Sequence, residues 1–105
     1  MYLVRRIFKM NPGMARKGAE IIYKMGKRYE DAGQRGPCRT YITGNTVPGP
    51  LHTVYMDWIE AELKNPYRKD NPKVPPIKGE VPLWSQLSPM LEETWIEFYE
   101  MYVPE

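Results

Sequence analysis

The stretch Cys38–Ile59, CRTYITGNTVPGPLHTVYMDWI, decides the fold. β-Branched and aromatic residues recur at every second position on both sides of the segment Gly44–Pro50, whose glycines and prolines favour a turn. The pattern predicts a β-hairpin with two different sides. The drier side carries Cys38, Thr40, Ile42, His52, Val54, Met56 and Trp58. The other side mixes tyrosines with polar groups, which suits a partner sheet or a wet cavity, and carries Arg39, Tyr41, Thr43, Leu51, Thr53, Tyr55 and Asp57.

Both ends of the chain are predicted to be strands. Tyr2–Lys9 has strand propensity, and because neighbouring side chains in a strand alternate, Arg5 and Arg6 point to opposite faces. One arginine must therefore face inward. The last run, residues 94–103, alternates in the same way and is expected to complete the sheet, with a helix over 95–101 as the alternative.

A long helix is predicted between the first strand and the hairpin, over residues 12–32. Asn11 suits a helix cap, and a proline is tolerated at the first helical position. Gly33 or Gly36 is expected to end the helix. The apolar face contains two glycines that permit close approach to the sheet or to a ligand, and it comprises Ala15, Gly18, Ala19, Ile22, Met25, Gly26 and Tyr29.

The second half of the chain is rich in prolines. Residues 60–82 are expected to form a long Pro- and Lys-rich loop, which is a lid, a dimer-embracing arm or a solvated connector. A second helix is predicted over 83–93 from leucines at four-residue spacing. Pro89 opposes a continuous helix there, so two short helices or a turn and a helix are alternatives.

Composition limits the classes of function. The chain of 105 residues fits a single domain, 1–105, and its 15 basic and 13 acidic residues lack the basic excess of a nucleic-acid binder. No apolar run is long enough to span a bilayer, and no signal peptide is recognised, so we expect a cytoplasmic protein without nucleic-acid or membrane partners. One cysteine and one histidine leave no cluster for a metal, and we expect no metal and no organic cofactor.

The predicted element order is that of the ferredoxin-like α+β fold, βαββαβ, in which a four-stranded antiparallel sheet carries both helices on one face. The first strand followed by Asn11-Pro12-Gly13, and the glycine-containing loop that leads into the strand ending at Trp58, resemble NIPSNAP-like members of the dimeric α+β barrel superfamily. This resemblance implies a homodimer in which the open sheet faces of two copies meet and complete a barrel. It also implies that any pocket lies between the sheet and the helices.

Relatives in that superfamily include cofactor-independent monooxygenases, haem-degrading enzymes, lactone isomerases and proteins of no known activity, so the fold leaves the function open. Haem is not expected, because no histidine matches the positions that bind it in some relatives. Our first hypothesis is a dimer that binds a hydrophobic or aromatic metabolite between sheet and helices and acts as a monooxygenase or isomerase if it is an enzyme. The alternative is a non-catalytic homodimeric assembly or regulatory module.

Several residues are candidates for the site. If the protein is an enzyme, His52 is the expected base and Arg6 the group that holds an oxyanion; His52 is otherwise a structural histidine at the hairpin mouth. Arg6 is also expected to meet Glu97 or Tyr99. The expected pocket walls are Tyr23, Tyr29, Trp58 and Trp84, which are core residues in the alternative interpretation.

Cys38 is a further candidate. Arg35 and Arg39 nearby would lower the pKa of its thiol and favour a nucleophile, whereas a buried structural cysteine is the alternative.

Overall fold

A computed structural model describes residues 1–44, 46–65 and 67–104. Asn45 of the predicted hairpin loop, Pro66 of the predicted long loop and Glu105 lie outside the described residues. The elements are β1 (Tyr2–Met10), α1 (Ala15–Asp31), β2 (Arg39–Thr43), β3 (Thr53–Glu60), α2 (Leu83–Leu87), a short 3-10 helix η1 (Ser88–Met90) and β4 (Leu91–Glu100).

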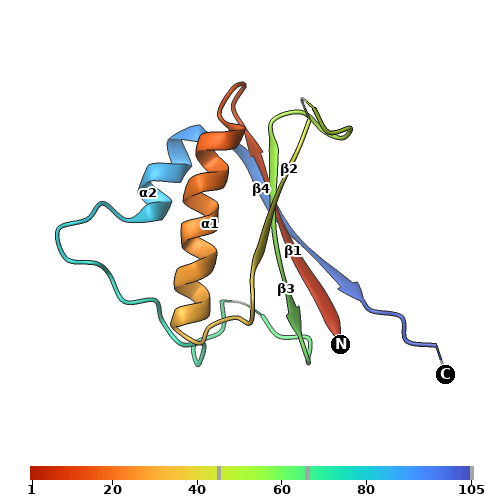
Figure 1. Ribbon diagram of the computed structural model, residues 1–105. Coiled ribbons are helices and arrows are strands. Elements are labelled where there is room, and N and C mark those ends of the chain that lie inside the picture. The colour runs from red at the N-terminus through yellow and green to blue at the C-terminus, as the bar shows by residue number, and fades with distance from the viewer. Residues whose placement is uncertain (45, 66, 105) are drawn as a thin grey trace.

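The strands form one antiparallel sheet in the order β2-β3-β1-β4. Figure 1 shows α1 and α2 on the same side of the sheet, with no helix on the other side. We call these sides the helix face and the open face. The arrangement confirms the predicted α+β class and the ferredoxin-like topology. No helix within the described ranges is long and apolar enough to cross a membrane.

The helix face holds the core. Side chains of β1, β3, α1 and α2 pack there, and the most completely buried include Val4, Phe8, Met10, Ile22, Val54, Met56, Trp58 and Leu87. The predicted apolar face of α1, which contains Gly18 and Gly26, is buried. A Cβ added to Gly26 would lie only 3.1 Å from Cys38 Cβ and 3.2 Å from Met56 Sδ. Gly26 therefore allows close packing of the helix on the sheet, one of the two roles expected for it.

The helix starts later than predicted. Residues 11–14 form a turn in which the Met14 N–H donates to the Asn11 carbonyl at 3.0 Å, and Gly13 has a φ of +81°. A proline followed by a glycine with positive φ is the signature of a type II turn, so Asn11 is not the helix cap. Instead, the Asn11 side chain donates to the Pro89 carbonyl and joins β1 to η1. The predicted helix end is confirmed at Gly33, whose φ is +74°.

The second helix is shorter than predicted. It ends at Leu87, η1 contains Pro89, and β4 begins at Leu91 rather than Thr94. Because the proline ring cannot continue an α-helix, the chain forms the 3-10 helix η1 instead. The last strand therefore begins three residues before the predicted position. Between β3 and α2 the described residues form no helix or strand, and this connection passes beside the carboxyl end of α1 (Figure 1).

Candidate functional site

Arg35 is the most unusual side chain on the helix face. It lies in the connection from α1 to β2 and is only 9% exposed. Its Cζ is 3.8 Å from the centre of the Trp58 ring and 4.1 Å from the centre of the Tyr29 ring, so the guanidinium is held between two aromatic side chains. Nε and Nη1 are buried and have no hydrogen-bond partner among the described residues.

The environment of Arg35 disfavours its charge. Burial lowers the pKa of Arg35, and the nearby charge of Arg6 lowers it too, whereas Tyr29 and Cys38 act in the opposite direction. Stacking on a desolvated aromatic ring is worth about 2 kcal/mol, while the burial of an ion without a counter-charge costs several kcal/mol. The two rings therefore offset much of the cost of this buried cation, but neither supplies a counter-charge.

Arg6 is a second cation on the same face. It lies opposite Met56 on β3, two positions from Trp58 and on the same side of the sheet. Its guanidinium is 4.9 Å from the centre of the Phe8 ring and 5.3 Å from that of Trp84, and Nε donates to Thr94 Oγ1 at 3.3 Å.

We call Arg6, Arg35, Tyr29, Trp58 and Trp84 the arginine–aromatic cluster. The ion pairs between described residues involve neither of its arginines. Glu60, which accepts a hydrogen bond from Trp58 Nε1 at 3.0 Å, forms no ion pair with them.

Two hollows lie next to this cluster. The first, of about 250 Å³, lies between α1 and the segment that leads into α2; Tyr29 and Trp84 line it with Met25, Arg28 and Leu83. The second, of about 430 Å³, lies between the helix face of β4 and the residues after β3, and is lined by Leu63, Lys64, Asn65, Tyr67, Ile96 and Phe98. Neither Arg6 nor Arg35 lines these hollows itself, but Arg6 adjoins both linings, since it stacks on Trp84 of the first and lies opposite Ile96 of the second.

The predicted pocket walls are only partly brought together. Tyr29, Trp58 and Trp84 belong to the arginine–aromatic cluster, although Trp58 is buried in the core rather than lining a hollow. Tyr23 is 53% exposed and lines a neighbouring hollow of about 280 Å³ between α1 and the segment before α2, which shares Arg28 and Leu83 with the first hollow. Arg35 was not among the predicted site residues, since its only signal in the sequence is an arginine shortly after the predicted helix end.

His52 lies apart from the arginine–aromatic cluster. It precedes β3 with a φ of +53°, and its Nδ1 accepts a hydrogen bond from the Gly13 N–H at 3.3 Å. Its carbonyl accepts from the Met10 N–H at 2.7 Å. These contacts join the start of β3 to the turn after β1, and His52 lines neither hollow of the cluster. Its role as a base stays a prediction.

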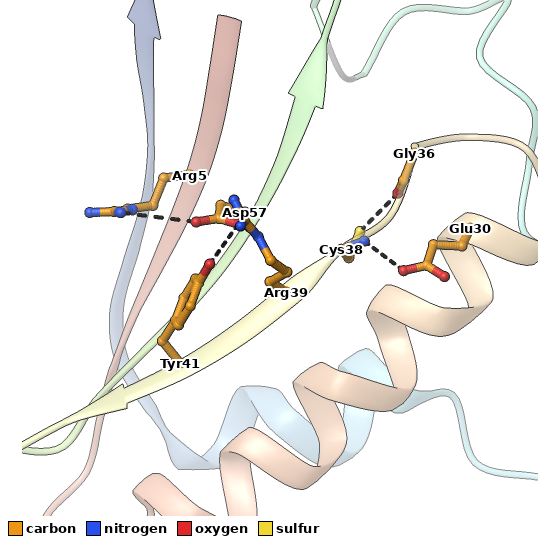
Figure 2. A network of polar contacts seen from close by, with 7 residues as sticks. All are labelled: Arg5, Glu30, Gly36, Cys38, Arg39, Tyr41 and Asp57. Atoms are coloured by element: carbon orange, nitrogen blue, oxygen red, sulfur yellow. Dashed lines mark hydrogen bonds and ion pairs between the residues drawn. The ribbon is translucent and has the colours of Figure 1, made fainter. Parts of the chain in front are cut away.

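Cys38 has the properties of a structural cysteine rather than those of a nucleophile. Its thiol donates to the Gly36 carbonyl at 3.6 Å, and its backbone N–H donates to Glu30 at 2.5 Å (Figure 2). Burial raises the pKa of the Cys38 thiol to about 11, although the charge of Arg35 acts in the opposite direction. A thiol with so high a pKa is protonated at neutral pH, so the predicted lowering of the pKa is wrong: Arg35 acts in the expected direction, but burial outweighs it.

The open face carries a row of alternating charges. The strand register places Arg39, Asp57, Arg5 and Glu97 side by side across β2, β3, β1 and β4. Asp57 is 1% exposed and accepts from Arg39 Nε at 3.2 Å and from Tyr41 Oη at 3.3 Å, while Arg5 approaches its other oxygen at 3.9 Å (Figure 2). The expected contact of Arg6 with Glu97 or Tyr99 is wrong, because both residues share the open face with Arg5.

Aromatic side chains border this charge row. Tyr41, Tyr55 and Trp95 occupy the next positions along β2, β3 and β4, and Tyr99 follows on the other side of Glu97. Tyr41, Trp95 and Tyr99 are 38%, 40% and 42% exposed. Tyr99 also donates a hydrogen bond to Glu97, which lowers the pKa of that carboxyl. The open face is therefore an exposed aromatic surface with ordered charges at its centre.

Comparison with known proteins identifies the fold. No protein-family model matches the chain, and no curated protein sequence matches it. The structure is similar to that of an uncharacterised NIPSNAP domain protein from Burkholderia xenovorans, with a TM-score of 0.62 and 15% identity over 100% of both chains. It is also similar to a NIPSNAP family protein from Agrobacterium tumefaciens strain C58, with a TM-score of 0.63 and 18% identity over 94% of this chain and 90% of the other. The resemblance expected from the sequence is thus confirmed at the level of the fold, and this chain has the fold of the NIPSNAP domain proteins.

Proposed function

We propose that this protein binds a hydrophobic or aromatic small molecule between its sheet and helices, as a homodimer joined through the open faces. The observation that carries the binding proposal is the pair of largely apolar hollows on either side of the arginine–aromatic cluster. Ligand sites are typically concave, mostly apolar and supplied with a few convergent polar groups. The geometry favours binding over catalysis, because the one histidine of the chain is engaged outside these hollows.

The dimer proposal rests on the charge row. Read across the sheet from β2 to β4, its signs alternate as Arg39, Asp57, Arg5 and Glu97. If a second copy is turned by a two-fold axis parallel to the strands, Arg39 faces Glu97 and Asp57 faces Arg5. Each charged residue of the row then faces a residue of opposite charge on the second copy, so the surface is electrostatically complementary to itself. The surrounding tyrosines and Trp95 have the composition of an interface core.

Native mass spectrometry of protein purified gently from cells tests both parts of the proposal. We expect a dimer that carries a reproducible small-molecule adduct. A dimer without an adduct, in repeated preparations, would support the assembly module instead, and a monomer would contradict the barrel.

A variant locates the interface. Trp95→Glu places a charge among the exposed aromatic residues of the open face, and we expect it to be a monomer at concentrations where the wild type is a dimer, measured by sedimentation velocity. Tyr23→Glu is the matched control, since it adds the same charge at an exposed aromatic residue of α1. Dissociation of both variants, or of neither, would place the interface elsewhere.

A further inference from the structure

The arginine–aromatic cluster contains two cations that the described part of the chain does not neutralise. Arg35 is more than nine-tenths buried as a residue, and two of its guanidinium nitrogens lack hydrogen-bond partners among the described residues. Arg6, beside it on the helix face, makes one hydrogen bond to a neutral hydroxyl. Proteins normally pair a buried charge or bind a counter-ion with it. Two unneutralised arginines side by side therefore point to an anion supplied from outside the chain.

The chemistry of the surroundings restricts this anion. Two aromatic rings enclose Arg35, and Arg6 adjoins one lining residue of each largely apolar hollow, Trp84 of the first and Ile96 of the second. A small inorganic ion would neutralise the arginines but leave the hollows unfilled. A molecule with an apolar or aromatic body and a single oxyanion satisfies both features, because guanidinium groups recognise carboxylates and similar oxyanions through charge-assisted hydrogen bonds.

We infer that Arg35 and Arg6 bind the anionic group of the ligand, and that the ligand is an apolar or aromatic molecule carrying a carboxylate or similar oxyanion. The inference rests on the proposed binding function and deepens it by naming the ligand class. It also explains why the fold retains the buried arginine Arg35, although the burial of its charge lowers the stability of the free protein. A cation that the protein alone leaves unneutralised lowers stability in the free state, and the ligand restores it on binding.

A pair of matched fluorescent probes tests the inference. 1-Anilinonaphthalene-8-sulfonate is an aromatic anion, and N-phenyl-1-naphthylamine has the same ring system without the sulfonate. We expect the wild-type protein to bind both probes and to bind the anion at least tenfold more tightly. Arg35→Met, which retains an apolar side chain of similar length, should reduce the affinity for the anion about tenfold and change that for the neutral probe less than twofold. Arg16→Met, at an exposed arginine of α1, should change neither affinity.

Thermal unfolding gives a second readout. Without a probe, Arg35→Met should have a higher Tm than the wild type, because the buried charge is gone. The anionic probe should then raise the Tm of the wild type more than that of the variant. Arg6→Met should also weaken binding of the anion, and it keeps the test valid if Arg35→Met does not fold.

The outcomes separate the two proposals. If neither probe binds, the proposed binding function fails and the inference fails with it. If both probes bind equally to the wild type, or if Arg35→Met and Arg6→Met leave the preference for the anion intact, the pocket stands and the anion-binding role of the arginines is wrong.

Discussion

The arginines on the two faces of the sheet have different kinds of partner. On the open face, Arg5 and Arg39 share the carboxylate of Asp57, and Glu97 lies opposite Arg5. On the helix face, Arg6 and Arg35 stack on aromatic rings, and neither forms an ion pair among the described residues. The open face is therefore balanced within the chain, as suits contact with an identical copy. The two arginines of the helix face lack an ion-pair partner among the described residues, as suits contact with an anion.

The contrast begins at two adjacent residues. Arg5 and Arg6 have the same chemistry and neighbouring positions, but the alternation of a strand sends their side chains to different faces. Arg5 meets Asp57, Tyr55 and Tyr99, while Arg6 meets Phe8 and Trp84. The environment, and not the residue type, decides which arginine pairs with a carboxylate of the chain and which lies beside the proposed ligand site.

The largest effect should follow from removing the central carboxylate of the open face. Asp57→Asn leaves Arg5 and Arg39 without their shared counter-charge at a buried position, and we expect a loss of about 2 kcal/mol in the free energy of unfolding. Both arginines are partly exposed, which keeps the loss below that of a fully buried pair. Urea unfolding at a fixed protein concentration measures it. The control is Asp70→Asn, at an exposed ion pair with Arg68, where we expect about 0.5 kcal/mol or less.

Substitution of the adjacent arginines by methionine compares the faces directly. Arg5→Met should cost about 1 kcal/mol and weaken the dimer, because it removes the partner of Asp57 and the contacts with Tyr55 and Tyr99. Arg6→Met should change stability by about 0.5 kcal/mol or less, because no ion pair is lost. Urea unfolding and sedimentation velocity measure the two effects. Equal losses of stability, or dissociation of both variants, would remove the distinction between the faces.

The smallest effect concerns Cys38, beside Arg35. Because the pKa of its thiol is raised to about 11 in the folded chain, we expect iodoacetamide to alkylate the native protein at pH 8 much more slowly than the urea-unfolded protein. The neutral thiol favours folding fully below about pH 9, and this contribution is lost as the pH rises towards 11. Cys38→Ala should therefore lose less stability than the wild type over that interval. Fast alkylation at pH 8 would show that the charge of Arg35 outweighs burial.

The sequence predicts the sheet well because its signals are local. Alternation in 38–43 and 52–59 predicts the two strands of the hairpin, whereas their register, with Ile42 opposite Val54, comes from the structure. The errors fall at prolines. Asn11-Pro12 has the residues of a helix cap as well as those of a turn, and only the positive φ of Gly13 decides between them.

The site was less predictable, because it depends on distances between elements. Nothing near Arg35 in the sequence shows that Tyr29 and Trp58 enclose it, since the three residues come from a helix, a loop and a strand. Alternation predicts that one of Arg5 and Arg6 faces inward without deciding which, and the neighbours expected for Arg6 lie on the other face. Placing Glu97 opposite Arg5 requires both the strand alternation and the register of β1 and β4, and the register comes from the structure.

The segment 67–82 has a consequence for how such a protein changes over evolutionary time. Its proline carbonyls hold it against the end of α1 and the residues that follow, since Arg28 of α1 donates to Pro75 and Gln34, just after the helix, donates to Pro72. No residue of this segment pairs with the sheet. Doubling the length of a flexible loop costs only about 0.6 kcal/mol of closure entropy. Insertions here would therefore enlarge or reshape the first hollow at little cost to the fold, so that one scaffold can acquire ligands of different size while the sheet remains unchanged.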